Sequence, residues 1–139
     1  MSCDVCQKLA AALADRQEIA VAYLFGSAAR EDTSALSDID VGVLLADRPS
    51  NLLRYRARLI EDLSRALAGA PVEVVLLDEA LPALAARAVR NGRLLVCRDE
   101  ARRVRFEIRA LQRDFDTAPL RQIYDRTLAN AIRQGRFYG

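Results

Sequence analysis

Residues 21–45, VAYLFGSAAREDTSALSDIDVGVLL, decide how this chain is organised. The apolar run Ile19–Phe25 leads into a Gly-Ser turn and a polar connection, and a second apolar run, Ile39–Leu45, then opens on two aspartates. Unbroken runs of strand-forming residues are typical of strands that are covered on both faces. The stretch therefore predicts two strands of a sheet flanked by helices, and we expect it to hold the functional site.

Helical periodicity marks most of the remaining sequence. Apolar residues at helical spacing predict a first helix that ends near Asp15, a second that begins at a Ser50 cap and ends at Gly69, and a short one over Pro82–Arg90. Two more helices are expected in the last third, with the apolar stripes Val104, Ile108, Leu111, Phe115 and Leu120, Ile123, Tyr124, Leu128, Ala131. Arginines lie on the other faces of these two helices, which is typical of a solvated or partner-binding surface.

Val72–Leu77 and Leu94–Val96 complete the expected sheet. Strands that alternate with helices indicate an α/β fold, and we expect a small mixed sheet of about four strands with two C-terminal helices. The length of 139 residues and the hydrophobic share of 52% suit one domain over residues 1–139, of which residues 99–139 form a helical tail.

Composition excludes several classes of function. No apolar run approaches the roughly 20 residues that cross a bilayer, and the first residues lack a signal core, so a cytoplasmic protein without membrane contact is expected. A net charge of +2 does not favour direct nucleic-acid binding. Nearly all basic residues are arginines, however, so contacts with the phosphate or carboxylate groups of a partner stay an alternative.

The absence of histidine excludes Ser-His and Cys-His catalysis. Cys3 and Cys6 lack a second pair for zinc, which favours reduced thiols.

Carboxylates are therefore the candidates for chemistry. Asp38 and Asp40 stand two residues apart at a strand start, so their side chains share a face, and two such carboxylates favour a cation such as Mg²⁺ between them. Glu73, a charge within an apolar strand, is the candidate third ligand, and three carboxylates can hold two metal ions about 3.5–4 Å apart. Gly26 and Ser27 can offer backbone N–H groups and a hydroxyl to phosphate oxygens. Together, the Asp-x-Asp pair, the third carboxylate and the Gly-Ser turn predict phosphoryl or nucleotidyl transfer. Each of these motifs alone also occurs in solvated turns and edge strands.

This arrangement resembles the nucleotidyltransferase superfamily that includes DNA polymerase beta, and specifically its minimal nucleotidyltransferase (MNT) branch. The residues that carry the resemblance are Leu24-Phe25-Gly26-Ser27, Ala29-Arg30 and Ser37-Asp38-Ile39-Asp40-Val41. Further likeness to stand-alone MNT antitoxins lies in Leu77-Asp78-Glu79-Ala80, Asn91-Gly92-Arg93-Leu94-Leu95, Tyr124-Asp125-Arg126 and Gly135-Arg136-Phe137-Tyr138. Two residues depart from the pattern: Glu31 replaces a glycine of the turn, and Glu73 stands where many members have Asp.

The resemblance implies an antitoxin that transfers AMP from ATP to a tyrosine hydroxyl of a HEPN-domain RNase toxin, with which it forms a hetero-oligomer. It further implies that Asp38 and Asp40 hold Mg²⁺ and the triphosphate and that Glu73 assists deprotonation of the hydroxyl. Gly26 and Ser27 would then hold the β- and γ-phosphates. Arg30 either steadies a phosphate or is a surface helix residue.

Two other functions stay open. A non-catalytic antitoxin that covers its toxin is compatible with the extra negative charge of Glu31 near the phosphate site. Nucleotidyl transfer to a small molecule such as an antibiotic is disfavoured, because 139 residues leave little room for an acceptor domain.

Overall fold

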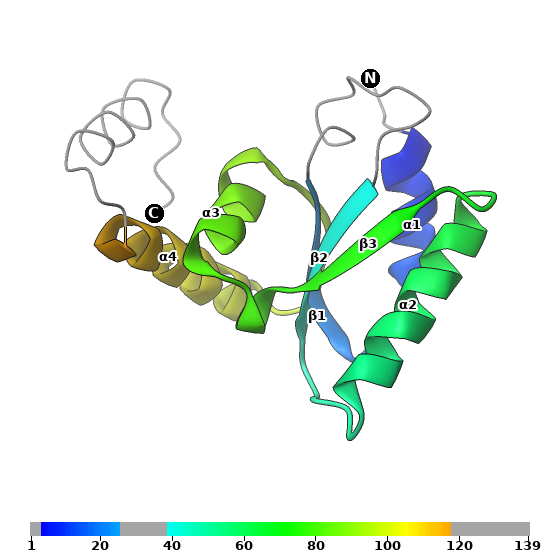
Figure 1. The fold of residues 1–139 in the computed structure, drawn as a ribbon, viewed down its shortest axis with the longest axis horizontal. Helices are drawn as coiled ribbons and strands as arrows, with labels where there is room; N and C mark the ends of the chain where they lie inside the picture. Colours follow the sequence, from blue (N-terminus) through cyan, green and yellow to red (C-terminus); the bar gives the residue numbers. More distant parts are fainter. Residues whose placement is uncertain (1–3, 26–38, 118–139) are drawn as a thin grey trace.

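The computed structural model describes residues 4–25 and 39–117, shown in Figure 1 as the coloured part of the ribbon. Helices and strands alternate along these two ranges. Their bounds are α1 Asp4–Leu13, β1 Ile19–Phe25, β2 Ile39–Leu45, α2 Leu52–Ala66, β3 Val72–Leu76, the 3₁₀ turn η2 Leu77–Glu79, α3 Pro82–Asn91, β4 Arg93–Cys97 and α4 Glu100–Thr117.

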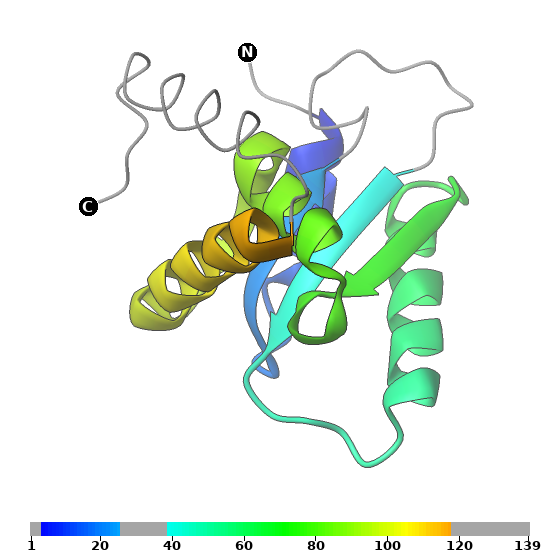
Figure 2. The ribbon, with the colours of Figure 1, turned by 60° about the vertical axis from the view of Figure 1, so that its left-hand side comes forward.

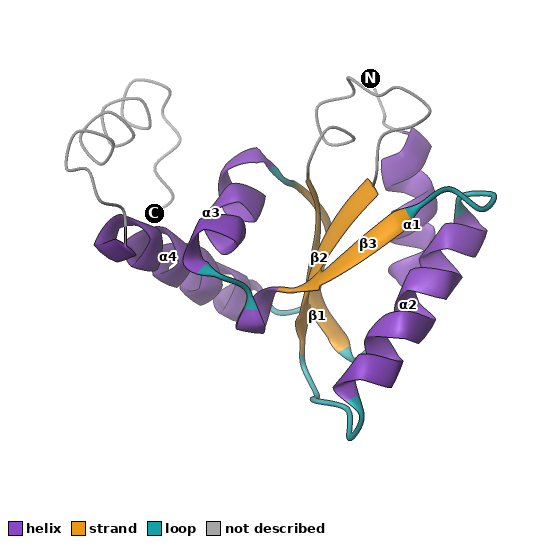
Figure 3. Cartoon of the chain, in the orientation of Figure 1, coloured by secondary structure: helices purple, strands orange, loops and turns teal. Residues whose placement is uncertain are grey.

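The described strands form one mixed sheet in the order β3-β2-β1-β4. β1 runs antiparallel to both β2 and β4, whereas β2 and β3 are parallel and α2 makes the crossover between them. Figure 3 shows α2 lying along the sheet beside β3. The α/β fold with a small mixed sheet flanked by helices is therefore confirmed.

Helices cover both faces of the sheet (Figures 1 and 2). One core lies between the sheet and α1 and α2, where Leu9, Leu13, Leu59 and Leu63 are fully buried. The second lies towards α3 and α4 and contains Tyr23. This double coverage explains why all of β1 is buried and why its sequence is an unbroken apolar run.

Several element boundaries differ from the predicted ones. Asn51, not Ser50, caps α2, because its Oδ1 accepts a hydrogen bond from the Arg54 backbone N–H at 3.0 Å. The third strand ends at Leu76, since Leu77 turns into η2 and packs against the sheet. The buried Leu77 side chain lies against Gly42 of β2, where an added Cβ would meet it at 2.9 Å.

The apolar stripe predicted for α4 coincides only in part with its buried face, since Leu111 packs against the core beside Ala110 but Ile108 does not. Ile108 is 47% exposed, whereas Glu107 and Ala110 are buried. α4 packs on α3, and an ion pair between Arg90 of α3 and Asp114 of α4 joins the two helices at 3.0 Å. The predicted second C-terminal helix lies outside the described residues, as does Cys3.

The Arg98 side chain, which follows β4, contacts the C-terminal end of α1. The Arg98 guanidinium donates to the carbonyl oxygens of Leu13 at 2.9 Å and Ala14 at 2.6 Å, which satisfies the C-terminal end of α1. No helix within the described ranges combines the length and apolar character that a membrane crossing requires.

Candidate active site

The parallel pairing of β2 and β3 brings two of the predicted carboxylates to neighbouring positions. Asp40 and Glu73 are direct partners in the register, so their side chains leave the same face of the sheet. On the other side of Asp40, the antiparallel partner is Phe25, the last residue before the Gly-Ser turn. Residues from β1, β2 and β3 thus stand in one row across the sheet, with Asp40 in the middle.

The two carboxylates differ in environment. Asp40 is half-buried, whereas the Glu73 side chain is 52% exposed on an edge strand. The residues on either side of Glu73 in β3, Val72 and Val74, are buried among the side chains of α1 and α2, so Glu73 leaves the opposite face, towards α3 and α4. Carboxylate oxygens on adjacent strands are a donor set that suits Mg²⁺.

The remaining predicted site residues, Gly26, Ser27, Arg30 and Asp38, lie outside the described residues, as does Glu31. Within residues 4–25 and 39–117 no group of three or more Asp, Glu, Cys or His side chains is placed to hold a metal ion. The three-carboxylate site therefore stays a prediction, and the structure places Asp40 and Glu73 at neighbouring positions of adjacent strands.

Arg56 is a site neighbour that sequence reasoning missed. From α2 it contacts Glu73 Oε1 through Nη2, and its Nε donates to the Val74 carbonyl oxygen at 2.7 Å. A signal was present, because Arg56 stands one turn after Leu52 and three residues before Leu59, which places a charge on the apolar stripe of this helix.

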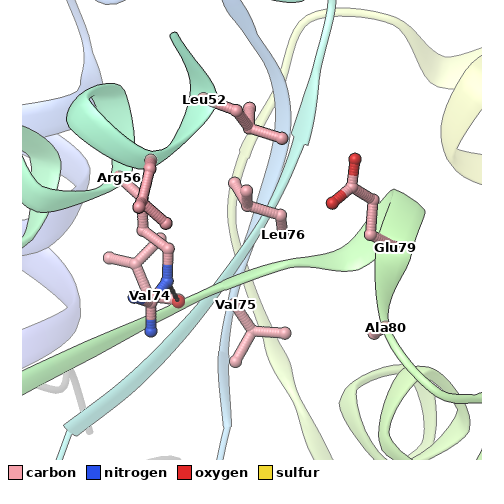
Figure 4. A pocket seen from close by; sticks show the side chains of 8 residues that line it. Leu52, Arg56, Val74, Val75, Leu76, Glu79 and Ala80 are labelled. Atoms are coloured by element: carbon pink, nitrogen blue, oxygen red, sulfur yellow. Dashed lines mark hydrogen bonds between the residues drawn. The ribbon is translucent and has the colours of Figure 1, made fainter.

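A pocket of about 390 Å³ adjoins Arg56 at the outer edge of β3. Figure 4 shows its lining, which comes from the first turn of α2, from β3 and from η2 with the residue after it. Most of the lining is apolar, with Arg56 and Glu79 as its charged members. Leu53, also part of the lining, is 77% exposed, so the rim presents a large apolar side chain to solvent.

A buried polar network fixes α4 against the sheet on the face that carries Asp40. The Tyr23 hydroxyl donates to Glu107 Oε2 at 2.7 Å, and Arg103 Nη1 donates to the same oxygen at 2.9 Å. Burial, reinforced by the hydrogen bond to Glu107, raises the pKa of Tyr23 well above its ordinary value of 10. Glu107 is only 7% exposed, and the hydrogen bonds from Tyr23 and Arg103 compensate for burial of its carboxylate.

The outer face of α4 carries arginines, as predicted for the helical tail. Arg105, Arg109 and Arg113 are all exposed. Arg102 and Arg103 are instead turned inward, and Arg102 grips Asp78 through both carboxylate oxygens at 2.9 and 3.1 Å. The exposed basic surface of α4 is therefore narrower than its sequence indicates.

Comparison with known proteins places this geometry in a family. A family model described as polymerase beta, nucleotidyltransferase, matches residues 7–101. This range contains β1, β2 and β3 with Asp40 and Glu73. A search of curated protein sequences finds no match.

Solved structures resemble nearly the whole chain. A toxin-antitoxin complex with AMP-PNP contains a chain that is 26% identical, with a TM-score of 0.65 over 92% of this chain and 93% of that chain. The complex of MntA with HepT matches at 25% identity and a TM-score of 0.59, over 93% and 92% of the two chains. A complex of a tri-AMPylated Shewanella oneidensis HEPN toxin with an MNT antitoxin matches at 25% identity and a TM-score of 0.59, over 93% and 91%.

Proposed function

Since the chain belongs to the polymerase beta nucleotidyltransferase family, we propose that it is an antitoxin that transfers AMP from ATP to a tyrosine hydroxyl of a HEPN-domain RNase toxin. The observation that carries the proposal is the register of Asp40 with Glu73, which gives the family's chemistry two adjacent carboxylates. Similarity to antitoxins in complexes with AMP-PNP and with an AMPylated toxin supports ATP as the substrate and the toxin as the acceptor.

The residues fit a magnesium site in their donor chemistry, since Asp38, Asp40 and Glu73 offer only carboxylate oxygens. When bound there, Mg²⁺ would neutralise the triphosphate and polarise the phosphoryl group under attack. We assign Asp38 and Asp40 to holding the cation and the triphosphate together. The strand pairing gives Asp40 a fixed backbone, while the length of Glu73 lets its carboxylate move.

The transfer is a single displacement at the α-phosphorus of ATP. A bond forms from the tyrosine oxygen to this phosphorus, the bond to the bridging oxygen of the β-phosphate breaks, and pyrophosphate leaves with the electron pair. Glu73 takes the hydroxyl proton as general base. Gly26 and Ser27 hold the β- and γ-phosphates through the turn, and Arg30 steadies a phosphate.

We propose that the toxin docks on α4, within the helical tail of residues 99–139, and forms a hetero-oligomer with this chain. The exposed arginines Arg105, Arg109 and Arg113 supply a basic surface on this helix. Charge reversal at all three positions is expected to weaken the complex, measured by calorimetry with the purified toxin. Complex formation at unchanged affinity would exclude α4 as the docking surface.

Transfer of label from ATP to the toxin tests the enzyme directly. Asp40→Asn is expected to lower the rate by about 100-fold or more, because it removes a charge that binds the metal. Asp47→Asn is the matched control, since Asp47 is exposed in the turn just beyond the other end of β2. If Asp40→Asn neutralises the toxin fully with no label transferred, the protein acts by covering its toxin instead.

A further inference from the structure

Arg56 reaches Glu73 at the outer edge of the sheet. β3 is an edge strand, and the Pro71 carbonyl oxygen accepts a hydrogen bond from Ile39 N–H of β2 at 3.3 Å. Carbonyl groups along a strand alternate in direction, so the carbonyl of Val74 faces away from β2. Because Arg56 Nε donates to this outward carbonyl, its guanidinium lies on the side of β3 away from Asp40.

The same guanidinium holds the Glu73 carboxylate. Arg56 belongs to α2, which covers the face occupied by Val72 and Val74, whereas Glu73 leaves the other face. The contact from Nη2 to Oε1 therefore passes around the strand edge and needs two long side chains. The Glu73 charge is balanced here by a cation of the chain itself.

We propose that Arg56 competes with the divalent cation for Glu73, an inference that rests on the proposed function. Glu73 would have to turn from the sheet edge towards Asp40 to serve as a metal ligand, and Arg56 holds one of its two oxygens back. Glutamate has one methylene more than the aspartate common in the family, which lets it reach the guanidinium in one rotamer and the metal in another. Glu73 is thus a ligand whose availability depends on Arg56.

The expected effect is small and has a defined sign. Arg56 and Glu73 are 36% and 52% exposed, and exposed ion pairs are weak, so loss of Arg56 is expected to tighten metal binding by about two- to five-fold. A residue that only oriented Glu73 for the metal would show the reverse sign, because its loss would weaken binding.

Binding of Mn²⁺ to the full chain without nucleotide, followed by electron paramagnetic resonance, tests the proposal. Arg56→Gln is expected to bind Mn²⁺ more tightly than the wild-type protein. Arg58→Gln is the matched control, since it removes the same charge from α2 and the described part of the chain offers Arg58 no ion-pair partner. Equal tightening in both variants, or unchanged or weaker binding in Arg56→Gln, would overturn the proposal.

A second variant guards against effects of Arg56→Gln on folding. Glu73→Ala removes the carboxylate for which Arg56 competes, so adding Arg56→Gln in this background should bring no further tightening. Additive gains would contradict competition for Glu73. If the wild-type protein and all variants bind no Mn²⁺, the proposed metal site is wrong, whereas measurable binding that Arg56→Gln leaves unchanged refutes only the role of Arg56.

Discussion

Replacement of Tyr23 by phenylalanine is expected to loosen α4 from the sheet. The variant removes the hydroxyl that donates to Glu107 at 2.7 Å and leaves Arg103 as the remaining donor to this oxygen. Hydrogen bonds to charged groups contribute about 1.5–3 kcal/mol, and since Arg103 stays, we expect the loss to be about 2 kcal/mol. For a chain of this length, the unfolding midpoint should fall by about 6–10 °C.

The assay is thermal and urea unfolding, with Tyr55→Phe as the matched control. The Tyr55 hydroxyl donates to Glu18 at 2.8 Å, but this pair is only partly buried, so its loss should cost about 1 kcal/mol or less. Hydrogen exchange should locate the loss of protection in α4 for Tyr23→Phe alone. Equal stability of Tyr23→Phe and the wild-type protein would show that the buried hydrogen bond contributes nothing, and the account of how α4 is anchored would fail.

The same network gives a pH dependence with a definite sign. Burial raises the pKa of Tyr23 in the folded state above the ordinary 10 that it regains on unfolding. The stabilisation is therefore fully present below about pH 10 and is lost as the pH rises towards the folded value. Alkaline unfolding followed by tyrosinate absorbance should begin at a higher pH in Tyr23→Phe, relative to its own stability at neutral pH, than in the wild-type protein. An identical pH dependence in the two proteins would contradict this assignment.

Two further variants probe the frame of the site. Arg98→Ala removes the donor to the Leu13 carbonyl oxygen at the end of α1 and should lower the free energy of unfolding by about 1–2 kcal/mol, measured by urea denaturation. An unchanged free energy would indicate that water replaces the guanidinium as the donor. Gly42→Ala adds a Cβ 2.9 Å from the buried Leu77 side chain and should destabilise the folded protein by about 1–3 kcal/mol. A crystal structure of the variant in which Leu77 has not moved would show that the space around this side chain is wider than described.

The sheet could be predicted from sequence because its central strands are buried on both faces. Ile19–Phe25 is an unbroken apolar run and Ile39–Leu45 is apolar apart from Asp40 and Gly42, and both strands are confirmed with the predicted bounds. The N-terminal cap of α2 could not be resolved in the same way, since Ser50 and Asn51 are both good caps and the backbone geometry decides between them.

The buried face of α4 was predicted only in part, for a different reason. Periodicity treats Glu107 as a solvent-facing residue, but Tyr23 from β1 and Arg103 from its own helix satisfy the charge and allow burial. A partner that lies 84 positions away in the sequence leaves no local signal. Arg56 differs, because its place on the apolar stripe of α2 is a local signal, although its carbonyl partner on β3 is known only once α2 is placed along the sheet edge.

The position of Glu73 was predicted, but its state was not. The sequence places a charge in an apolar strand, and the register confirms that it stands beside Asp40. From the sequence, glutamate in place of aspartate indicates only a third ligand that is longer by one methylene. The ion pair with Arg56 adds a second position for the carboxylate, at the outer edge of β3. In the competition proposed above, the longer side chain serves both positions, and the substitution then reflects a balance between Arg56 and the metal ion.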